Sequence, residues 1–253
     1  MPIRTIIFDL FDTLVDLGLP RMAAAPAGAR PVHSTAARLH EAMLGQGGGG
    51  AEISLERFVE VLREVDRSLM LPRHREGREL STVERFETLA DLLGLADPAL
   101  PGLLTEVHMG ALTEYVSTPE HHPETLAGLG RRRQLGLCSN FTHAETARRV
   151  LQEARLDPHL DAVVISEEVG IRKPRAEIFQ ATLDALDARP DETLHVGDNL
   201  SADVGGAAAL GVGTVWITRR VREPEAALKK YQGPPPDWTI GDLAELEPLL
   251  EAR

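Results

Sequence analysis

Four short runs of consecutive apolar residues each end in a polar residue, and together they predict a parallel β-sheet. Continuous apolar runs are typical of strands buried on both faces. The runs and the residues that follow them are Ile3–Phe8 before Asp9, Leu135–Cys138 before Ser139, Ala162–Ile165 before Ser166, and Thr193–Val196 before Gly197-Asp198. A fifth strand is predicted at Thr214–Ile217. Because ligands bind at the carboxyl edge of open α/β sheets, these polar strand ends are expected to converge.

Helical patterns lie between the runs and supply the crossovers that parallel strands need. One is Ala144–Leu156, after a start signal at Thr142, and another is Ala176–Leu186. From about residue 18 to 115 the chain has no convincing strand. Apolar residues there recur at helical spacing over Leu55–Leu69, after an N-cap at Ser54, and again over Val83–Leu93.

These patterns predict an α/β fold with two domains. Residues 1–17 and 116–253 are expected to form a core domain with a Rossmann-like parallel sheet flanked by helices. Residues 18–115 are expected to form a second, mainly helical domain inserted early in the core domain. Two stretches within the insertion, Ala23–Arg30 and Gly45–Gly50, are rich in Ala, Pro and Gly without periodicity and are expected to be mobile.

Composition narrows the classes of partner. The chain has 253 residues, 43% of them hydrophobic, and a formal net charge of −12. This charge repels nucleic acid and anionic membranes at long range, so neither is expected as a partner. Asp9 and Asp12 interrupt the apolar stretch Ile3–Leu14, and no signal peptide or membrane span is predicted. The single cysteine, Cys138, fits a cytoplasmic location.

The candidate chemistry begins at the first strand end, in the run Asp9–Leu14. A carboxylate there is costly to bury unless a metal or hydrogen-bond donors compensate. Asp12 and Thr13 also fit an ordinary turn, so this motif alone leaves a turn and a site open. Ser139-Asn140 is either a helix cap or a set of donors aimed at an oxyanion.

Two later motifs add charge. Lys173, before Pro174, is an ordinary loop residue or, near carboxylates, a point charge that binds a phosphoryl oxygen. In Gly197–Ala207, Asp198 follows a strand and could bind a hard cation, whereas Asp203 could orient Lys173 or a ligating water.

Taken together, these residues resemble the four ordered motifs of the haloacid dehalogenase-like (HAD) hydrolase superfamily. The residues that carry the resemblance are Asp9, Thr13, Ser139, Lys173, Asp198 and Asp203. The runs Ser139–Phe141, Ser166–Pro174 and Gly197–Ala207 resemble the subfamily whose helical cap is inserted after the first motif.

The resemblance implies a phosphatase acting on a small phosphorylated metabolite through an aspartyl-phosphate. Asp9 would be the nucleophile, and Mg²⁺ would be held by Asp9, Asp198 and the backbone carbonyl of Phe11. The protein is expected to be a monomer or a homodimer.

The remaining motif residues would handle the transferred group. Ser139, Asn140 and Lys173 would bind it. Thr13 would support it, and Asp203 would have a supporting role.

One position departs from the phosphatases of the superfamily, which read Asp-x-Asp-x-Thr and use the second Asp as general acid and base. Phe11 stands there, and an aromatic ring transfers no proton. A ring at this position resembles the metal-independent 2-haloacid dehalogenases, whereas Gly197-Asp198 with Asp203 resembles the metal-dependent members. The longer fourth motif favours a phosphatase, with a dehalogenase or a catalytically weak ligand-binding protein as alternatives.

Two further clusters are interpreted as solvated surface. His121-His122 lies in a predicted connecting loop, and Arg131–Arg133 lies between a helix and a strand.

Overall fold

The computed structural model describes residues 2–18, 24–25, 32–33, 35–46, 50 and 52–251. It divides into two compact units, Met1–Asp16 with Ser117–Arg253, and Leu17–Val116. Each junction lies one residue from the boundary predicted from the sequence. The short strands β2 (Asp16–Leu17) and β5 (Val116–Ser117) pair in a two-stranded sheet of their own.

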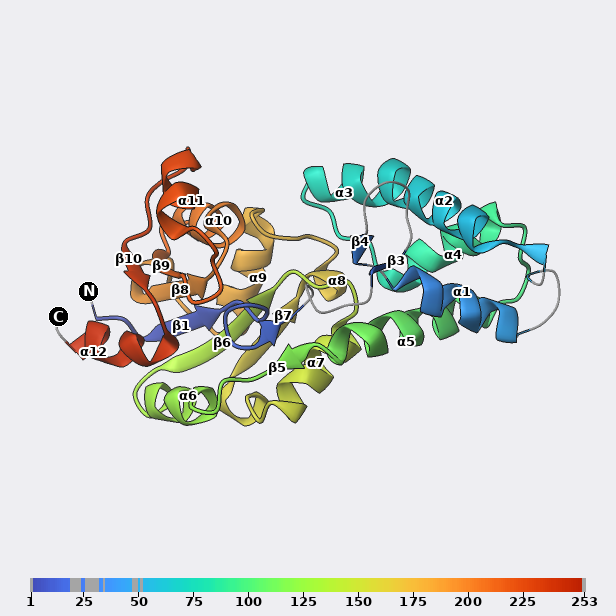
Figure 1. The fold of residues 1–253 in the computed structure, drawn as a ribbon. Coiled ribbons are helices and arrows are strands. Elements are labelled where there is room, and N and C mark those ends of the chain that lie inside the picture. The colour runs from blue at the N-terminus through green and yellow to red at the C-terminus, as the bar shows by residue number, and fades with distance from the viewer. Residues whose placement is uncertain are drawn as a thin grey trace. The chain divides into compact units, whose positions relative to one another are not determined.

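The first unit is built on a parallel sheet, as predicted (Figure 1). Six strands of the described residues pair in the order β10-β9-β8-β1-β6-β7, and every pair is parallel. They are β1 (Thr5–Phe8), β6 (Gln134–Ser139), β7 (Ala162–Ile165), β8 (Thr193–Gly197), β9 (Gly213–Ile217) and β10 (Trp238–Ile240). Because β1 lies between β8 and β6, all four of its residues are buried.

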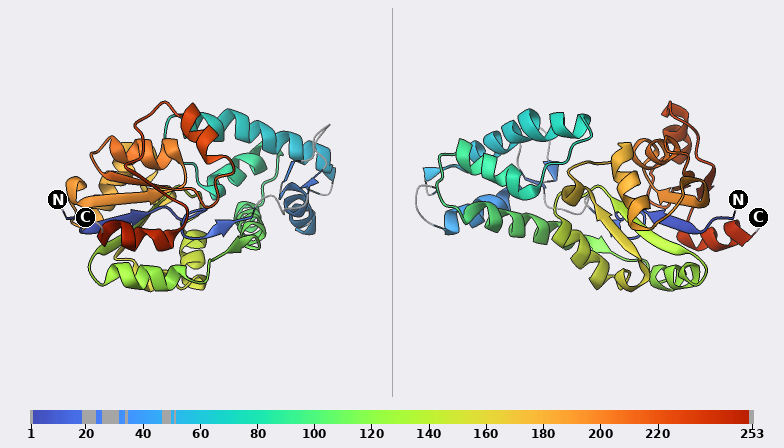
Figure 2. Two further views of the ribbon diagram at one scale, coloured as in Figure 1. Left: turned by 60° about the vertical axis from the view of Figure 1, so that its left-hand side comes forward. Right: turned by 180° about the vertical axis from the view of Figure 1, so that it is seen from behind.

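Helices cover both faces of this sheet (Figure 1; Figure 2). One face carries α6 (His122–Gly130), α7 (Ala144–Glu153) and α12 (Leu246–Glu251), and the opposite face carries α9 (Ala176–Ala185) and α10 (Gly206–Ala208). Under α9, the fully buried Phe179 and Ile178 pack with Ile7 of β1 and Cys138 of β6. The short helices α8 (Ser166–Val169) and α11 (Pro224–Lys230) lie in the connections.

Turns complete the connections of this unit. A π-helical segment at Leu200–Gly205 leads into α10, and 3-10 turns lie at Asp157–His159, Pro190–Glu192 and Leu243–Glu245.

The second unit is mainly helical. Its helices are α1 (Ala36–Gly45), α2 (Leu55–Val65), α3 (Leu71–Arg75), α4 (Thr82–Leu92) and α5 (Leu100–Thr113), with a π-helical segment at Asp66–Met70 between α2 and α3. Ser54 caps α2 by accepting a hydrogen bond from the Arg57 N–H, which confirms the predicted N-cap. The helices bury one apolar cluster that includes Phe58 and Phe86.

Three details differ from the sequence predictions. The edge strand β10 was missed because it has only three residues, of which one is buried. The N-cap position of α7 is His143 rather than Thr142, and the His143 side chain makes no capping hydrogen bond. In the inserted segment, the two-residue strands β3 (Ala24–Ala25) and β4 (Val32–His33) pair antiparallel.

Of the stretches predicted to be mobile, most of Ala23–Arg30 and residues 47–49 of Gly45–Gly50 lie outside the described residues, whereas Gly45 is the last residue of α1. In the part of the chain that is described, no helix combines the length and apolar character needed to cross a membrane.

Phe86 and Leu92 of α4 offer a matched test of the second unit's core. Phe86 is 0% exposed and Leu92 is 47% exposed. Replacing Phe86 by Ala should lower the free energy of unfolding by about 3–5 kcal/mol, because it removes a fully buried ring and leaves a cavity. Leu92→Ala should change it by no more than about 0.5 kcal/mol. Denaturant unfolding of both variants checks this, and equal losses would refute the observed packing.

Candidate active site

Three neighbouring strands bring their polar ends to one edge of the sheet. Asp9 follows β1, Ser139 ends β6, and Asp198 follows β8. Because β1 pairs with both β6 and β8 in parallel register, these ends are adjacent. The carboxyl edge is where α/β sheets bind ligands, so this edge is the candidate site.

Lys173 lies at the centre of the site. Its side-chain ammonium donates to Asp9 Oδ1 at 2.6 Å, to Asp203 Oδ1 at 2.7 Å and to the Cys138 carbonyl at 2.7 Å. An ammonium has three N–H donors, so all three are used. Lys173 is only 3% exposed, and a buried ammonium requires such compensation. The direct contact with Asp9 makes Lys173 a positioning group for that carboxylate.

Asp203 is held by donors on both of its oxygens. Oδ1 accepts from Lys173 and lies 2.9 Å from Nε2 of the buried His195, while Oδ2 accepts from the Asn199 N–H at 2.9 Å. Gly197 is required beside it, because a Cβ at that position would lie 2.2 Å from Asp203 Cγ. Asp203 is therefore fixed by its surroundings and fixes Lys173 in turn.

The charges at the site shift one another's protonation. Burial raises the pKa of Asp9 to about 6, although Lys173 acts to lower it. Burial alone would lower the pKa of Lys173, but the carboxylates of Asp203 and Asp9 hold it above its ordinary value. Burial alone would raise the pKa of Asp203, but Lys173 and His195 hold it well below its usual range. The Lys173–Asp203 pair is therefore ionised, and Asp9 is ionised above about pH 6.

Asp198 is the carboxylate without a partner. Among the described residues its side chain makes no ion pair or hydrogen bond, although its backbone carbonyl accepts from Trp216 Nε1 at 2.7 Å. Burial, followed by repulsion from Asp9, raises the pKa of Asp198 to about 8. One carboxylate oxygen from each of Asp9, Asp198 and Asp203 lies within 4.8 Å of the others. Within this cluster, the unpaired carboxylate of Asp198 beside Asp9 fits a hard divalent cation, which would hold Asp198 ionised at neutral pH.

Two hydroxyl groups are also left without partners. Thr13 Oγ1 and Ser139 Oγ are both buried and find no hydrogen-bond partner in the described part of the chain. A buried hydroxyl without a partner loses the hydrogen bonds it makes with water, so such groups are uncommon in folded proteins. Beside a candidate nucleophile, they are suited to bind the oxygens of a substrate.

Asn140 has a different surrounding from the one that the sequence suggested. Its amide nitrogen donates to the Lys173 carbonyl at 3.0 Å, and its amide oxygen accepts from the Lys173 N–H at 2.7 Å. Both polar groups of the side chain are thus used to hold the Lys173 backbone. Direct contacts of Asn140 and Lys173 with substrate remain predictions. Each would require one of the present hydrogen bonds of that side chain to be replaced.

Phe11 packs against Phe141, with ring centroids 4.7 Å apart and an angle of 34° between the planes. Its backbone forms an isolated β-bridge with Val15, and the role of its carbonyl as a metal ligand remains a prediction. Asp12 has a positive φ of 59°, and its Oδ1 lies 3.4 Å from Arg220 Nε. Its carboxylate is therefore directed to Arg220.

Sequence reasoning missed two groups of this site. His195 interrupts the buried run Thr193–Val196, and that polar interruption was the available signal. Ser166 follows β7, and its hydroxyl both accepts from the Phe141 N–H at 2.9 Å and donates to the Phe141 carbonyl at 3.2 Å. It holds the loop after β6 and was identified only as a strand end.

The interpretation of His121-His122 as solvated is wrong for His122. Its side chain is fully buried, and its Nδ1 lies 2.7 Å from the Leu14 carbonyl oxygen. Helix α6 begins at this residue, which places the ring inside the unit. His121 is exposed, as predicted.

Comparison with known proteins shows the family of the chain. A family model described as haloacid dehalogenase-like hydrolase matches residues 3–211. The chain is 32% identical to pyrimidine 5'-nucleotidase YjjG of Escherichia coli over 169 residues, which cover 66% of this chain and 69% of that protein. It is 30% identical to (S)-2-haloacid dehalogenase 4A of Burkholderia cepacia over 192 residues, which cover 72% and 80%.

A solved structure shares the fold. The 2-haloacid dehalogenase of Pseudomonas syringae superposes with a TM-score of 0.67 at 21% identity and covers 99% of both chains. The protein is a hydrolase of the α/β class with a parallel sheet. It belongs to the haloacid dehalogenase-like hydrolase family, as the sequence motifs predicted.

The raised pKa of Asp198 predicts how stability depends on pH without metal. Because the folded pKa is about 8 and the ordinary value is 3.8, folding favours the protonated form. The stability that protonated Asp198 contributes to the folded state is fully present below about pH 4 and is lost as the pH rises through about 8. In chelator, Asp198→Asn should therefore gain in Tm over the native protein as the pH rises from 5 to about 8.5. A Tm difference that is independent of pH would contradict the assigned burial and repulsion.

Proposed function

We propose that this hydrolase is a Mg²⁺-dependent phosphatase that acts on a small phosphorylated metabolite through an aspartyl-phosphate on Asp9. The observation that carries the proposal is the carboxylate of Asp198, which has no cation partner beside Asp9. Asp203 cannot serve Mg²⁺ in the same way, because Lys173, His195 and a backbone N–H occupy its oxygens. Asp9 and Asp198, with the backbone carbonyl of Phe11, would hold the ion.

The residues of the chain act on the substrate in a defined order. Asp9 attacks phosphorus, the bond to the leaving oxygen breaks, and a carboxyl phosphate forms on Asp9. Water then attacks that phosphorus, releasing inorganic phosphate and restoring the carboxylate. Lys173 holds Asp9 Oδ1 in place, and the free hydroxyls of Ser139 and Thr13 donate to phosphoryl oxygens. Bound Mg²⁺ would offset the repulsion between carboxylate and phosphate and stabilise charge in the transition state.

The relatives support this proposal without deciding it. YjjG is named a pyrimidine 5'-nucleotidase, which is a phosphatase activity on a small phosphorylated molecule. The Burkholderia relative is named a haloacid dehalogenase, so the same family contains both chemistries.

A second candidate is a dehalogenase, and Phe11 is the observation that favours it. The ring packs on Phe141 where phosphatases of the superfamily carry a second Asp. Displacement of halide needs no general acid, so an aromatic ring at this position would not slow that reaction. Above about pH 8, where Asp198 is ionised without metal, its carboxylate next to Asp9 repels an anionic haloacid, which argues against this candidate at alkaline pH.

The metal requirement separates the candidates. With an aryl phosphate as substrate, turnover should vanish in chelator and return with Mg²⁺, and Asp9→Asn should abolish it with the fold retained. Asp198→Asn should raise the Mg²⁺ concentration for half-maximal rate by about tenfold or more. Asp191→Asn is the matched control, since that carboxylate is exposed and paired with Arg189. Halide release from a 2-haloacid without metal would support the dehalogenase instead.

Phe11 makes a further prediction about leaving groups. With no acid to protonate a departing alkoxide, the rate should fall steeply as the leaving-group pKa rises, so aryl phosphates should be cleaved far faster than alkyl phosphates. Phe11→Asp should raise the rate on alkyl phosphates by about tenfold or more, within the limit set by the lost packing on Phe141. Steady-state kinetics on a series of phosphate esters measures this.

Asp12→Asn is the companion variant for that series. The native protein could instead show a flat leaving-group dependence that becomes steep in Asp12→Asn. In that case Asp12 supplies the proton, and the prediction that Phe11 leaves the site without a general acid is wrong.

A further inference from the structure

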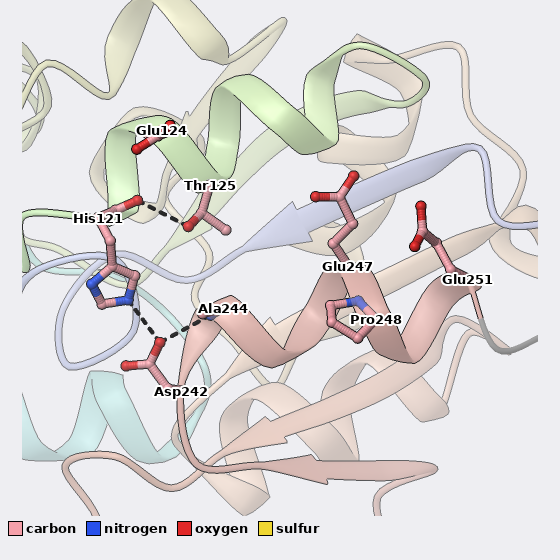
Figure 3. Close-up of a pocket in the computed structure, with 8 residues that line it drawn as sticks. All are labelled: His121, Glu124, Thr125, Asp242, Ala244, Glu247, Pro248 and Glu251. Atoms are coloured by element: carbon pink, nitrogen blue, oxygen red, sulfur yellow. Dashed lines mark hydrogen bonds and ion pairs between the residues drawn. The ribbon is translucent and has the colours of Figure 1, made fainter.

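A second group of metal-binding side chains lies at the surface of the first unit, built from residues that the catalytic proposal does not use. His121 and His122 stand at the start of α6, and Asp242 precedes the 3-10 turn that leads into α12. One potential ligand atom from each of these residues lies within 4.8 Å of the others. Figure 3 shows the His121 ring and the Asp242 carboxylate in direct contact, among the residues from α6 and α12 that line a pocket.

His122 carries the argument, because its hydrogen bonding is incomplete. Its Nδ1 lies 2.7 Å from the Leu14 carbonyl oxygen, which can only accept, so Nδ1 carries the proton. Its Nε2 is buried and has no hydrogen-bond partner among the described residues. A carbonyl on one imidazole nitrogen is the usual arrangement for orienting the other nitrogen toward a metal. A purely structural role explains the hydrogen bond to Leu14 but does not explain why Nε2 is buried without a partner.

The neighbouring rings and charges point the same way. His121 packs edge-on against His122, with ring centroids 4.7 Å apart, and its Nε2 lies 2.7 Å from Asp242 Oδ1. Three further carboxylates line the pocket, those of Glu124, Glu247 and Glu251. They raise the local concentration of cations.

Two positive groups among the described residues oppose a cation at this place. Arg219 Nε lies 4.0 Å from Asp242 Oδ2, but its guanidinium is mainly engaged by Asp16, 3.0 Å away. Arg132 Nη1 lies 3.6 Å from Glu251 Oε1. The four acidic side chains of the pocket outnumber these two.

We propose that His121, His122 and Asp242 form a binding site for a transition-metal ion of the Zn²⁺ type. Two imidazoles and one carboxylate suit Zn²⁺, Co²⁺ and Ni²⁺, whereas Mg²⁺ prefers oxygen ligands alone. Three protein ligands leave the remaining positions to water. Binding requires the hydrogen bond between His121 and Asp242 to open, and it joins the start of α6 to the segment that leads into α12.

Cobalt provides a direct probe of this site, since tetrahedral Co²⁺ bound to imidazole absorbs visible light. The whole protein, freed of metal, is titrated with Co²⁺ in excess Mg²⁺, so that sites with oxygen ligands are already filled. We expect an absorption band that saturates at one ion per chain. Zn²⁺ should abolish the band and raise the Tm by roughly 5 °C when it is present at a hundredfold over its Kd.

Variants locate the ion. His121→Ala and Asp242→Asn should each weaken Co²⁺ binding by at least about tenfold. Asn keeps the cap on the Ala244 N–H, so Asp242→Asn tests the charge and not the turn. His159→Ala, which removes a half-buried imidazole outside the cluster, should leave the titration unchanged. His122 is buried, so its replacement is avoided as a risk to folding.

The outcomes are decisive in both directions. No saturable band, or a band that survives both His121→Ala and Asp242→Asn, would overturn the proposal. The titration does not depend on catalysis, so its result is independent of whether the protein is a phosphatase.

Discussion

The buried ammonium of Lys173 is the interaction on which the candidate site depends. It joins Asp9, which follows the first strand, to Asp203 within the fourth motif, and both contacts are shorter than 3 Å. Removing these charges from water is costly, and their attraction offsets that cost only in good geometry. The surroundings supply that geometry. Asn140 holds the Lys173 backbone, and His195 holds Asp203.

The same charge balance explains why the site would bind an anionic group only with an additional cation. One ammonium compensates two carboxylates, Asp9 and Asp203, so the ionised groups carry a net negative charge even below about pH 8, where Asp198 is protonated. A phosphate arriving at such a site would be repelled, so a second cation is needed before the nucleophile can approach it. The two unpartnered hydroxyls supply donors but no charge. This is the physical basis for preferring a metal-dependent reaction.

Fold and family do not decide between the two chemistries, since the named relatives include a nucleotidase and a dehalogenase. The decision rests on two positions that disagree. Phe11 has no proton to give to an alkoxide leaving group, whereas Asp198 would provide an oxygen ligand for a metal ion that halide displacement does not use. A function lies in the chemistry of such positions rather than in the scaffold that carries them.

The sequence by itself determined the sheet, the helical insertion and the motif residues at the strand ends, because continuous apolar runs and helical periodicity are local signals. It also placed Asp9, Lys173 and Asp203 in one set through their resemblance to a family. Only the tertiary structure decided what each polar group contacts: the amide of Asn140 on the Lys173 backbone, and His122 on the Leu14 carbonyl. Those partners are 33 and 108 residues apart, and no local pattern encodes which distant group the folded chain brings within hydrogen-bond distance.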